Sequence, residues 1–304
     1  MTPGLLFFAL IVATGCATSD TARDADAGQA HLVRARHYRD RELSVSALVE
    51  FALALEDNPR LIEAHIGIGR IYLNRGEYPR AADAFQRAAR INPHSFDAHY
   101  YFGLAQQLMG RIEQAIHAYH RALTIDADSA DANRNLASAY LQLNRLDLAL
   151  RHAERAVELD PQSQGAWANL AAVYSLLGEY QKAVHAYRRA AEPDDMPEPL
   201  LLGLADAHLK LGNLDRAINV LQSVVHRSPS ALAYERLGYA QFKQRHFNDA
   251  LASYEAAHAI DPDDTAVLNG LGVGLMTLYL GSDGTDPSQW ERAVAAWRRS
   301  ITLR

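Results

Sequence analysis

Residues Gly165–Ala191, GAWANLAAVYSLLGEYQKAVHAYRRAA, form the stretch that decides the fold. At 3.6 residues per turn, this stretch predicts two short amphipathic helices separated at Gly178. Neither helix can bury its apolar face alone, so the stretch predicts a helical hairpin that needs neighbours. The two faces alternate large and small residues: Trp167, Leu170, Ala171 and Tyr174 on the first helix, and Tyr180, Ala183, Tyr187 and Ala190 on the second.

The same pattern recurs along the chain at an almost constant spacing. Steps of 34 residues, then one of 33 and a longer last step, join the alanines that are equivalent to Ala183. Alanine suits this column because the position should face the other helix of its hairpin at close range, where a larger side chain would force the helices apart. The column consists of Ala47, Ala81, Ala115, Ala149, Ala183, Ala217, Ala250 and Ala293.

Further columns repeat in step with these alanines. The column of Ala171 is small in every unit, and the column of Tyr187 is mostly large. A third column favours residues that tolerate a left-handed turn between helices, and prolines between the units stop the second helix. The columns read Ala35, Gly69, Gly103, Ala137, Ala171, Ala205, Gly238 and Gly272; Phe51, Phe85, Tyr119, Ala153, Tyr187, Leu221, Tyr254 and Trp297; Gly76, Gly110, Asn144, Gly178 and Gly212; and Pro59, Pro93, Pro161, Pro229 and Pro262.

This order of Trp, Leu, Gly or Ala, Tyr, then Gly, Tyr, Ala, Tyr and Ala resembles the tetratricopeptide (TPR) repeat. The resemblance extends from Gly28 to Arg304. It implies an all-α fold, a right-handed superhelical solenoid of about eight helix-turn-helix repeats whose first helices line a concave face. The predicted units are residues 28–61, 62–95, 96–129, 130–163, 164–197, 198–230, 231–264 and 265–304.

Some units depart from the pattern. The first has Arg34 where the others have Leu, Ile or Phe, and it lacks a turn glycine, so it fits a capping repeat with one solvated face. Residues 192–197, EPDDMP, predict an irregular junction, and residues 281–289, GSDGTDPSQ, lengthen the turn of the last unit. Asp283 and Asp286 in that turn lack the spacing of an EF-hand loop, so we expect a plain surface loop.

The N-terminus carries the features of an export signal. Leu5–Ala13 is an apolar run that is too short to span a bilayer and has the length of a signal-peptide core. The following residues, ATGC at 13–16, resemble the lipobox of bacterial lipoproteins. The resemblance implies that residues 1–15 are removed, that Cys16 is lipidated, and that residues 16–27 form a flexible tether. Ala17 in place of Asp favours the outer membrane. An ordinary secretory signal or a short buried helix is the alternative.

Composition and motifs argue against several function classes. The 304 residues carry a net charge of −6, and 22% of them are charged, so we expect no nucleic-acid partner. The only cysteine is Cys16, which excludes an intramolecular disulfide. No phosphate loop or catalytic motif is present, so we expect no enzyme and no cofactor. His31, His65 and His99 share the Trp167 column and are interpreted as packing residues, while His117 and His120 lack a third metal ligand nearby.

The concave face that the resemblance implies is the candidate site. Asn135 and Asn169 share one column, and in TPR proteins asparagines there hydrogen-bond the backbone of an extended peptide. Tyrosines supply flat contact area. The Lys, Asn and Arg set of the carboxylate-clamp TPR proteins is absent, so no such clamp is predicted. The predicted groove residues are Glu63, Arg70, Asn74, Asp97, Tyr100, Tyr101, Arg134, Asn135, Ser138, Asn169, Asp206, Glu235, Arg236, Tyr239 and Asn269.

These features together predict a non-enzymatic scaffold lipoprotein on the periplasmic face of the outer membrane in a Gram-negative bacterium. It resembles the TPR lipoproteins that assist type IV or Flp pilus and secretin assembly. The alternative is an adaptor that recruits peptidoglycan hydrolases or a periplasmic protease, and an enzyme is the remote third reading. The C-terminal stripe of Trp290, Val294, Trp297 and Ile301 could also form a homodimer contact.

Overall fold

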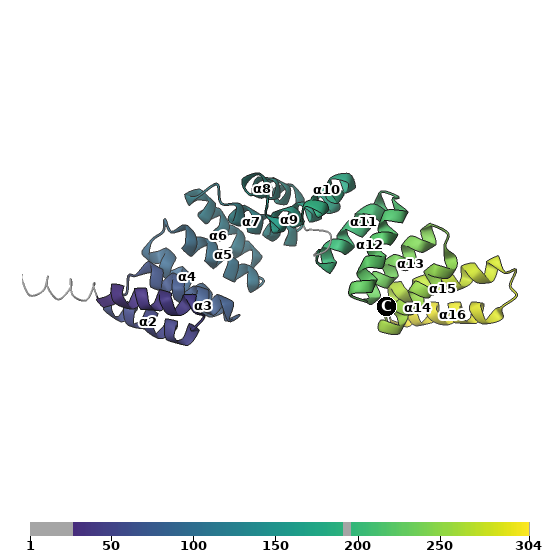
Figure 1. Ribbon diagram of the computed structural model, residues 1–304, viewed down its shortest axis with the longest axis horizontal. Coiled ribbons are helices and arrows are strands. Elements are labelled where there is room, and N and C mark those ends of the chain that lie inside the picture. The colour runs from purple at the N-terminus through teal and green to yellow at the C-terminus, as the bar shows by residue number, and fades with distance from the viewer. Residues whose placement is uncertain (1–26, 191–195, 304) are drawn as a thin grey trace, which may run out of the picture. The chain divides into compact units, whose positions relative to one another are not determined.

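The computed structural model describes residues 27–190 and 196–303 and is all-helical there. The predicted signal peptide, Cys16, most of the tether and all but the last two residues of the segment 192–197 lie outside these residues. The helices form hairpins in chain order (Figure 1). They are a helix over residues 27–40, α2 (Ser44–Asp57), α3 (Ile62–Asn74), α4 (Tyr78–Ile91), α5 (Phe96–Leu108), α6 (Ile112–Ile125), α7 (Ala130–Gln142), α8 (Leu146–Leu159), α9 (Gln164–Leu176), α10 (Tyr180–Ala190), α11 (Glu198–Lys210), α12 (Leu214–Arg227), α13 (Ala231–Lys243), α14 (Phe247–Ile260), α15 (Thr265–Gly281) and α16 (Pro287–Thr302).

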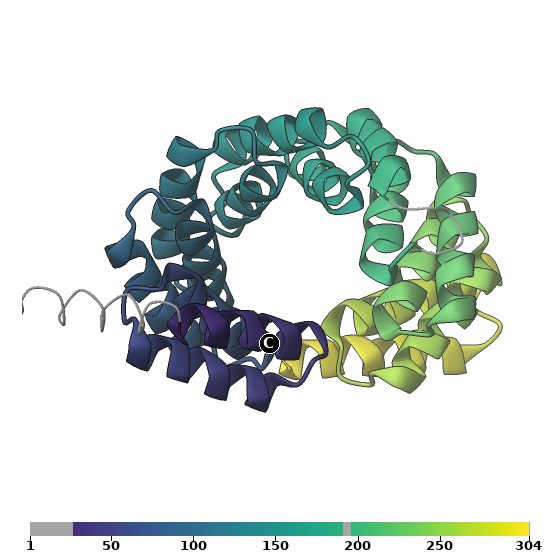
Figure 2. The same ribbon diagram turned by 60° about the vertical axis from the view of Figure 1, so that its left-hand side comes forward.

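The chain divides into two compact units, residues 1–145 and 146–304. Within each unit, every helix from α2 onward packs against its neighbours in the chain. In unit 1 the first helices α3, α5 and α7 also touch one another in succession, whereas the second helices α2, α4 and α6 do not do so in the described part. In unit 2 the helices α9, α11, α13 and α15 touch in the same way. Figure 2 shows the stacked helices of each unit. The first helices therefore form one continuous face in each unit, which we call the first-helix face.

The alanine column is buried as the sequence predicts. All eight alanines, from Ala47 to Ala293, are 0% exposed. No room is left for a larger side chain at these positions, because the interior of a protein is close-packed. The all-α repeat fold predicted from the spacing is confirmed.

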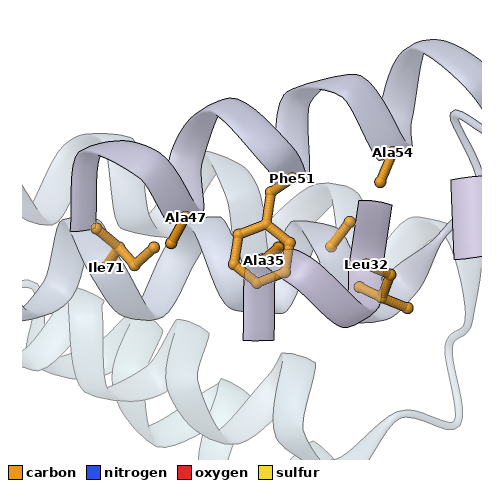
Figure 3. Close-up of a cluster of buried hydrophobic side chains, with 7 residues drawn as sticks. Leu32, Ala35, Ala47, Phe51, Ala54 and Ile71 are labelled. Carbon is orange, nitrogen blue, oxygen red and sulfur yellow. The ribbon is translucent and has the colours of Figure 1, made fainter. Parts of the chain in front are cut away.

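Glycines on the first helices leave space for the large side chains of the second helices. A Cβ atom at Gly67 would overlap the ring of Phe51, and one at Gly69 would lie 2.5 Å from Cε1 of Phe85. Helix α3 is thus held between a ring from α2 and a ring from α4. Figure 3 shows Phe51 in the cluster that it forms with Leu32, Ala35, Ala47, Ala54 and Ile71.

The turn column adopts the left-handed conformation. Gly76, Gly110, Gly178 and Gly212 have φ between 74° and 78°, and Asn144 has φ 53°. The structure adds two residues that the sequence analysis did not place in this column, Glu42 (φ 59°) and Arg245 (φ 68°). The first and seventh hairpins therefore make the same turn without a glycine, at a cost in backbone strain.

Arg245→Gly tests this strain. We expect the free energy of unfolding to rise by about 0.5–1 kcal/mol, because glycine adopts a positive φ without the clash of a Cβ atom. Urea denaturation measures the change. Gly178→Ala, at φ 78°, is the matched opposite and should destabilise. Equal stability of wild type and Arg245→Gly would show that the turn carries no strain.

The Trp167 column has a role beyond packing. Trp167 donates its indole N–H to the carbonyl of Pro161 at 2.9 Å. His65 and His99 contact the carbonyls of Pro59 and Pro93 at 3.1 Å and 2.9 Å through Nε2. Each of these side chains therefore ties the start of a first helix to the carbonyl six residues earlier, at the junction between units.

The first unit exposes a polar side chain, and the last unit exposes apolar ones. Arg34 is exposed and donates to Glu50 at 2.9 Å, in line with a solvated first unit. Asp286 accepts from the backbone N–H of Ser288 and caps α16. Trp290 is 47% and Ile301 72% exposed, and the homodimer through this edge stays a prediction. None of the helices that the structure describes is long and apolar enough to span a bilayer.

Candidate functional site

An aromatic cluster lies on the first-helix face of unit 1. The rings of Tyr100 and Tyr101 on α5 meet edge to face at 5.1 Å. The guanidinium of Arg70, from α3, lies 5.3 Å from the centre of the Tyr101 ring. Asn135, from α7, donates through Nδ2 to the hydroxyl of Tyr100 at 3.1 Å. Three successive first helices thus bring these four predicted groove residues together, and we call them the aromatic cluster.

Buried groups support the aromatic cluster from below. Phe85 stacks on Tyr101 at 5.4 Å. The hydroxyl of Tyr119 donates to Gln107 at 2.8 Å, and Gln107 donates through Nε2 to the hydroxyl of Ser138 at 3.3 Å. Burial raises the pKa of Tyr100, and the nearby Asp131 adds to this rise. A tyrosine hydroxyl is protonated at neutral pH, so that of Tyr100 can donate as well as accept.

Tyr119→Phe tests the support. Removing the hydroxyl leaves Gln107 without its donor, and we expect the free energy of unfolding to fall by about 1 kcal/mol. Tyr254→Phe is the matched control, because Tyr254 occupies the same column, is also buried, and makes no hydrogen bond through its hydroxyl to any residue that the structure describes. Urea denaturation compares the two variants. Equal losses in the free energy of unfolding would show that the hydrogen bond from Tyr119 to Gln107 does not stabilise the protein.

The other predicted residues of unit 1 lie on the same first helices as the aromatic cluster. Glu63, Asn74 and Asp97 are exposed. In the described chain, no ion pair or side-chain hydrogen bond joins these three residues to the cluster. Arg134 pairs with Asp131 on its own helix at 3.0 Å. Of these four residues, Arg134 acts on the cluster through its charge, which lowers the pKa of Tyr100.

Unit 2 carries a different arrangement on its first-helix face. Arg236, on α13, lies 3.4 Å from Asp206 on α11 and 3.8 Å from its neighbour Glu235. Burial raises the pKa of Asp206, whereas Arg236 and Lys210 lower it. Burial likewise raises the pKa of Glu235, with Arg236 lowering it. Two half-buried carboxylates share one guanidinium, so this face can accept a further cationic group from a ligand.

The remaining predicted residues of unit 2 lie on the same series of helices. Tyr239 is 41% exposed, and the ammonium of Lys243 lies 5.5 Å from its ring centre. Asn169 on α9 and Asn269 on α15 are half-buried. The structure thus places every predicted groove residue on a first helix. Whether these residues bind a ligand stays a prediction.

The sequence analysis did not identify some of the residues that contact or influence the predicted groove residues. Gln107 lies seven residues after Tyr100, two helical turns further along the same face of α5, and this spacing was the available signal. Tyr119 was assigned only to packing, although its hydroxyl reaches the first-helix face through Gln107. Asp264 caps α15 by accepting from the N–H groups of Ala266 and Val267. Its charge also raises the pKa of Glu235.

The residues that the structure describes contain no group of three or more His, Cys, Asp or Glu side chains that could hold a metal ion. The imidazole of His120 contacts the hydroxyl of Tyr140 at 2.7 Å. His120 therefore has a place in side-chain packing.

Sequence models of one repeat family match most of the array. Models described as tetratricopeptide repeat match residues 106–172, 166–195 and 202–272, and a TPR repeat model matches residues 69–110. The chain is a tetratricopeptide repeat protein. This repeat is a non-enzymatic scaffold for protein–protein interaction, and TPR proteins bind protein or peptide partners. No curated protein matches the sequence.

Solved TPR structures share the fold at low sequence identity. Pseudomonas aeruginosa PilF is 19% identical with a TM-score of 0.62, over 70% of this chain and 96% of PilF. PilW, described as a widely conserved type IV pilus biogenesis factor, is 20% identical with a TM-score of 0.59, over 66% of this chain and 94% of PilW. YrrB, described as a TPR protein with an unusual peptide-binding site, is 22% identical with a TM-score of 0.56, over 62% of this chain and 97% of YrrB.

Proposed function

We propose that this TPR protein is a lipid-anchored scaffold on the periplasmic face of the outer membrane, where its first-helix faces hold protein partners. The observation that best supports partner binding is the aromatic cluster. Its rings come from one helix, while an amide and a guanidinium reach it from the two neighbouring helices. Tyrosine and arginine are enriched at binding hot spots, and an asparagine amide can donate to and accept from a peptide backbone.

The membrane anchor is proposed from Cys16 and the apolar run before it. A single acyl chain binds a membrane only weakly, so stable anchoring needs more than one. Metabolic labelling with a fatty acid tests the anchor: we expect label on the wild type and none on Cys16→Ser. No label on the wild type, or equal label on both, would contradict it.

The envelope process that we propose is pilus or secretin assembly. Its support is the likeness of fold to PilF and PilW, together with the lipobox-like sequence at residues 13–16. A deletion strain tests this role. Loss of secretin multimers with unchanged cell-wall composition supports it. Intact multimers with a changed cell wall would favour the alternative adaptor for peptidoglycan hydrolases or a periplasmic protease.

Site-specific crosslinking tests the aromatic cluster directly. A photo-crosslinking phenylalanine derivative replaces Tyr101 in the lipidated protein, and the captured protein is identified by mass spectrometry. The same derivative at Tyr180, half-buried on the second helix α10, is the matched control. We expect capture from position 101 and none from position 180.

Mild substitutions separate binding from folding. Arg70→Ala removes an exposed guanidinium, and Tyr100→Phe removes only the hydroxyl that Asn135 contacts. Both variants should keep the helical circular-dichroism spectrum and lower the crosslinking yield severalfold. An unchanged yield in both would place the partner site elsewhere.

A further inference from the structure

A groove opens on the opposite side of unit 1, between the second helices α4 and α6. Helix α5 forms its floor through Phe102, Gln106 and Met109. Its walls contain the small residues Ala82 and Ala118. The groove encloses a volume of about 810 Å³, within the range of ligand sites. We call it the α4–α6 groove, and it shares none of its residues with the aromatic cluster.

The sequence shows why the groove is open at this repeat. In the second hairpin the ring of Tyr72 lies 5.2 Å from the guanidinium of Arg80, and in the fifth the ring of Tyr174 lies 5.4 Å from the ammonium of Lys182. Steps of 34 residues from Tyr72 and Arg80 lead to Gln106 and Gln114 in the third hairpin. Both glutamines line the α4–α6 groove. The ring and its cation are thus replaced by two shorter side chains, which leave space between the helices.

Gln106 is buried in the groove without a full set of partners. It is 5% exposed, and its Oε1 atom has no hydrogen-bond partner among the residues that the structure describes. A buried acceptor without a donor is unfavourable, because it has given up its hydrogen bonds to water. An N–H group from a ligand in the groove would satisfy this amide.

The rim of the groove is basic, although the whole protein has a net charge of −6. Arg90 on α4, Arg111 at the N-cap of α6 and Arg121 on α6 line it, with Asp83 as the acidic lining residue. None of the three guanidinium groups forms a salt bridge within the described chain, and Arg90 donates only to the neutral side chain of Gln86, at 3.1 Å. Their charges are therefore available to an anionic ligand.

The spacing of these cations suits an extended chain. Arg111 and Arg121 are ten residues apart, which is about 15 Å along a helix at 1.5 Å per residue. An extended segment covers this distance in about five residues. A single small carboxylate could reach only one end of the groove.

We propose that the α4–α6 groove binds an acidic segment of a partner protein. Carboxylates of the segment pair with Arg90, Arg111 and Arg121, an apolar side chain packs on Phe102 and Met109, and an N–H group donates to Gln106. This site is separate from the first-helix face and does not depend on the envelope role. It gives unit 1 a second docking surface, on its second helices.

A peptide selection tests the proposal. Random seven-residue peptides are displayed and selected on the folded array, with counter-selection on Gln106→Tyr. Tyrosine stands in the same column at Tyr72, Tyr140 and Tyr174, so Gln106→Tyr should fold and fill the groove. We expect Asp and Glu to be enriched among the selected peptides. The best peptide, measured by fluorescence anisotropy, should bind Gln106→Tyr at least tenfold more weakly.

Two controls and three outcomes decide the result. Gln222→Tyr makes the same change at an exposed position of α12 and should keep wild-type affinity. Arg121→Glu should weaken binding of the acidic peptide at least tenfold. It should weaken binding of a control peptide with Asn and Gln in place of the acids much less. Absence of acid enrichment, equal affinity of wild type and Gln106→Tyr, or equal binding of a random single-stranded oligonucleotide would each overturn the proposal.

Discussion

Gly69→Val should destabilise unit 1 by about 3 kcal/mol, because overpacking of a close-packed core costs about 1–3 kcal/mol and occasionally more. A Cβ atom at Gly69 would lie 2.5 Å from Cε1 of Phe85, which is itself 0% exposed. Helix propensity acts in the opposite direction, since glycine in a helix is about 1 kcal/mol less favourable than alanine. The packing clash should therefore outweigh the gain in propensity.

Two spectroscopic signals assign this effect to unit 1. All three tryptophans, Trp167, Trp290 and Trp297, belong to unit 2. Urea denaturation followed by circular dichroism should show the loss, while the tryptophan fluorescence transition changes less. Gly281→Ala is the matched control, because a Cβ atom there would meet nothing within 4 Å, and it should be neutral or slightly stabilising.

A second substitution tests the cause. Reducing the opposing ring in Gly69→Ala/Phe85→Leu should recover much of the stability that Gly69→Ala loses, because the two residues share one space. Losses that simply add would show that the ring of Phe85 is not the group that excludes a side chain at position 69.

The fold was predictable from the sequence because its packing rule repeats at a fixed interval. The alanines from Ala47 to Ala293 are all 0% exposed, and a single column sufficed to place every hairpin. The turn column was read from its glycines and Asn144, so Glu42 and Arg245 were missed. Each of the two lies one repeat away from a turn residue, so its positive φ could have been predicted from the spacing. The residue type alone does not indicate a positive φ.

The contacts within the site were less predictable. Spacing placed Tyr100 and Asn135 on the first-helix face, but the hydrogen bond between them depends on how closely α5 and α7 approach. The α4–α6 groove was missed for a related reason. The column shows a glutamine at Gln106, but that this residue lines a cavity depends on how α4, α5 and α6 pack around it.

Lowering the pH from about 7 to 5 should destabilise unit 2 through His208. This imidazole, on α11, is 2% exposed, and its Nδ1 atom has no hydrogen-bond partner among the described residues. Burial lowers the pKa of His208, and the charges of Arg188 and Arg216 lower it further. The unfolded chain therefore takes up a proton near the ordinary histidine pKa of about 6.5, before the folded chain does.

The sign of the pH dependence follows from that order. Stability from neutral His208 is complete above about pH 6.5 and is lost as the pH falls toward the lower pKa of the folded state. His208→Leu removes this contribution. Leucine is tolerated in the same column, where Leu275 is 1% exposed, so the variant should fold.

Urea denaturation of wild type and His208→Leu, followed by tryptophan fluorescence at pH 8 and pH 5, measures the effect. At pH 8 the two proteins differ only by packing, because the histidine is neutral in both states. At pH 5 the variant should gain stability relative to the wild type. Burial also lowers the pKa of His65 and His120 in unit 1, so the circular-dichroism transition should keep part of its pH dependence. If the stability measured by fluorescence falls equally in both proteins between pH 8 and pH 5, His208 does not cause the acid sensitivity of unit 2.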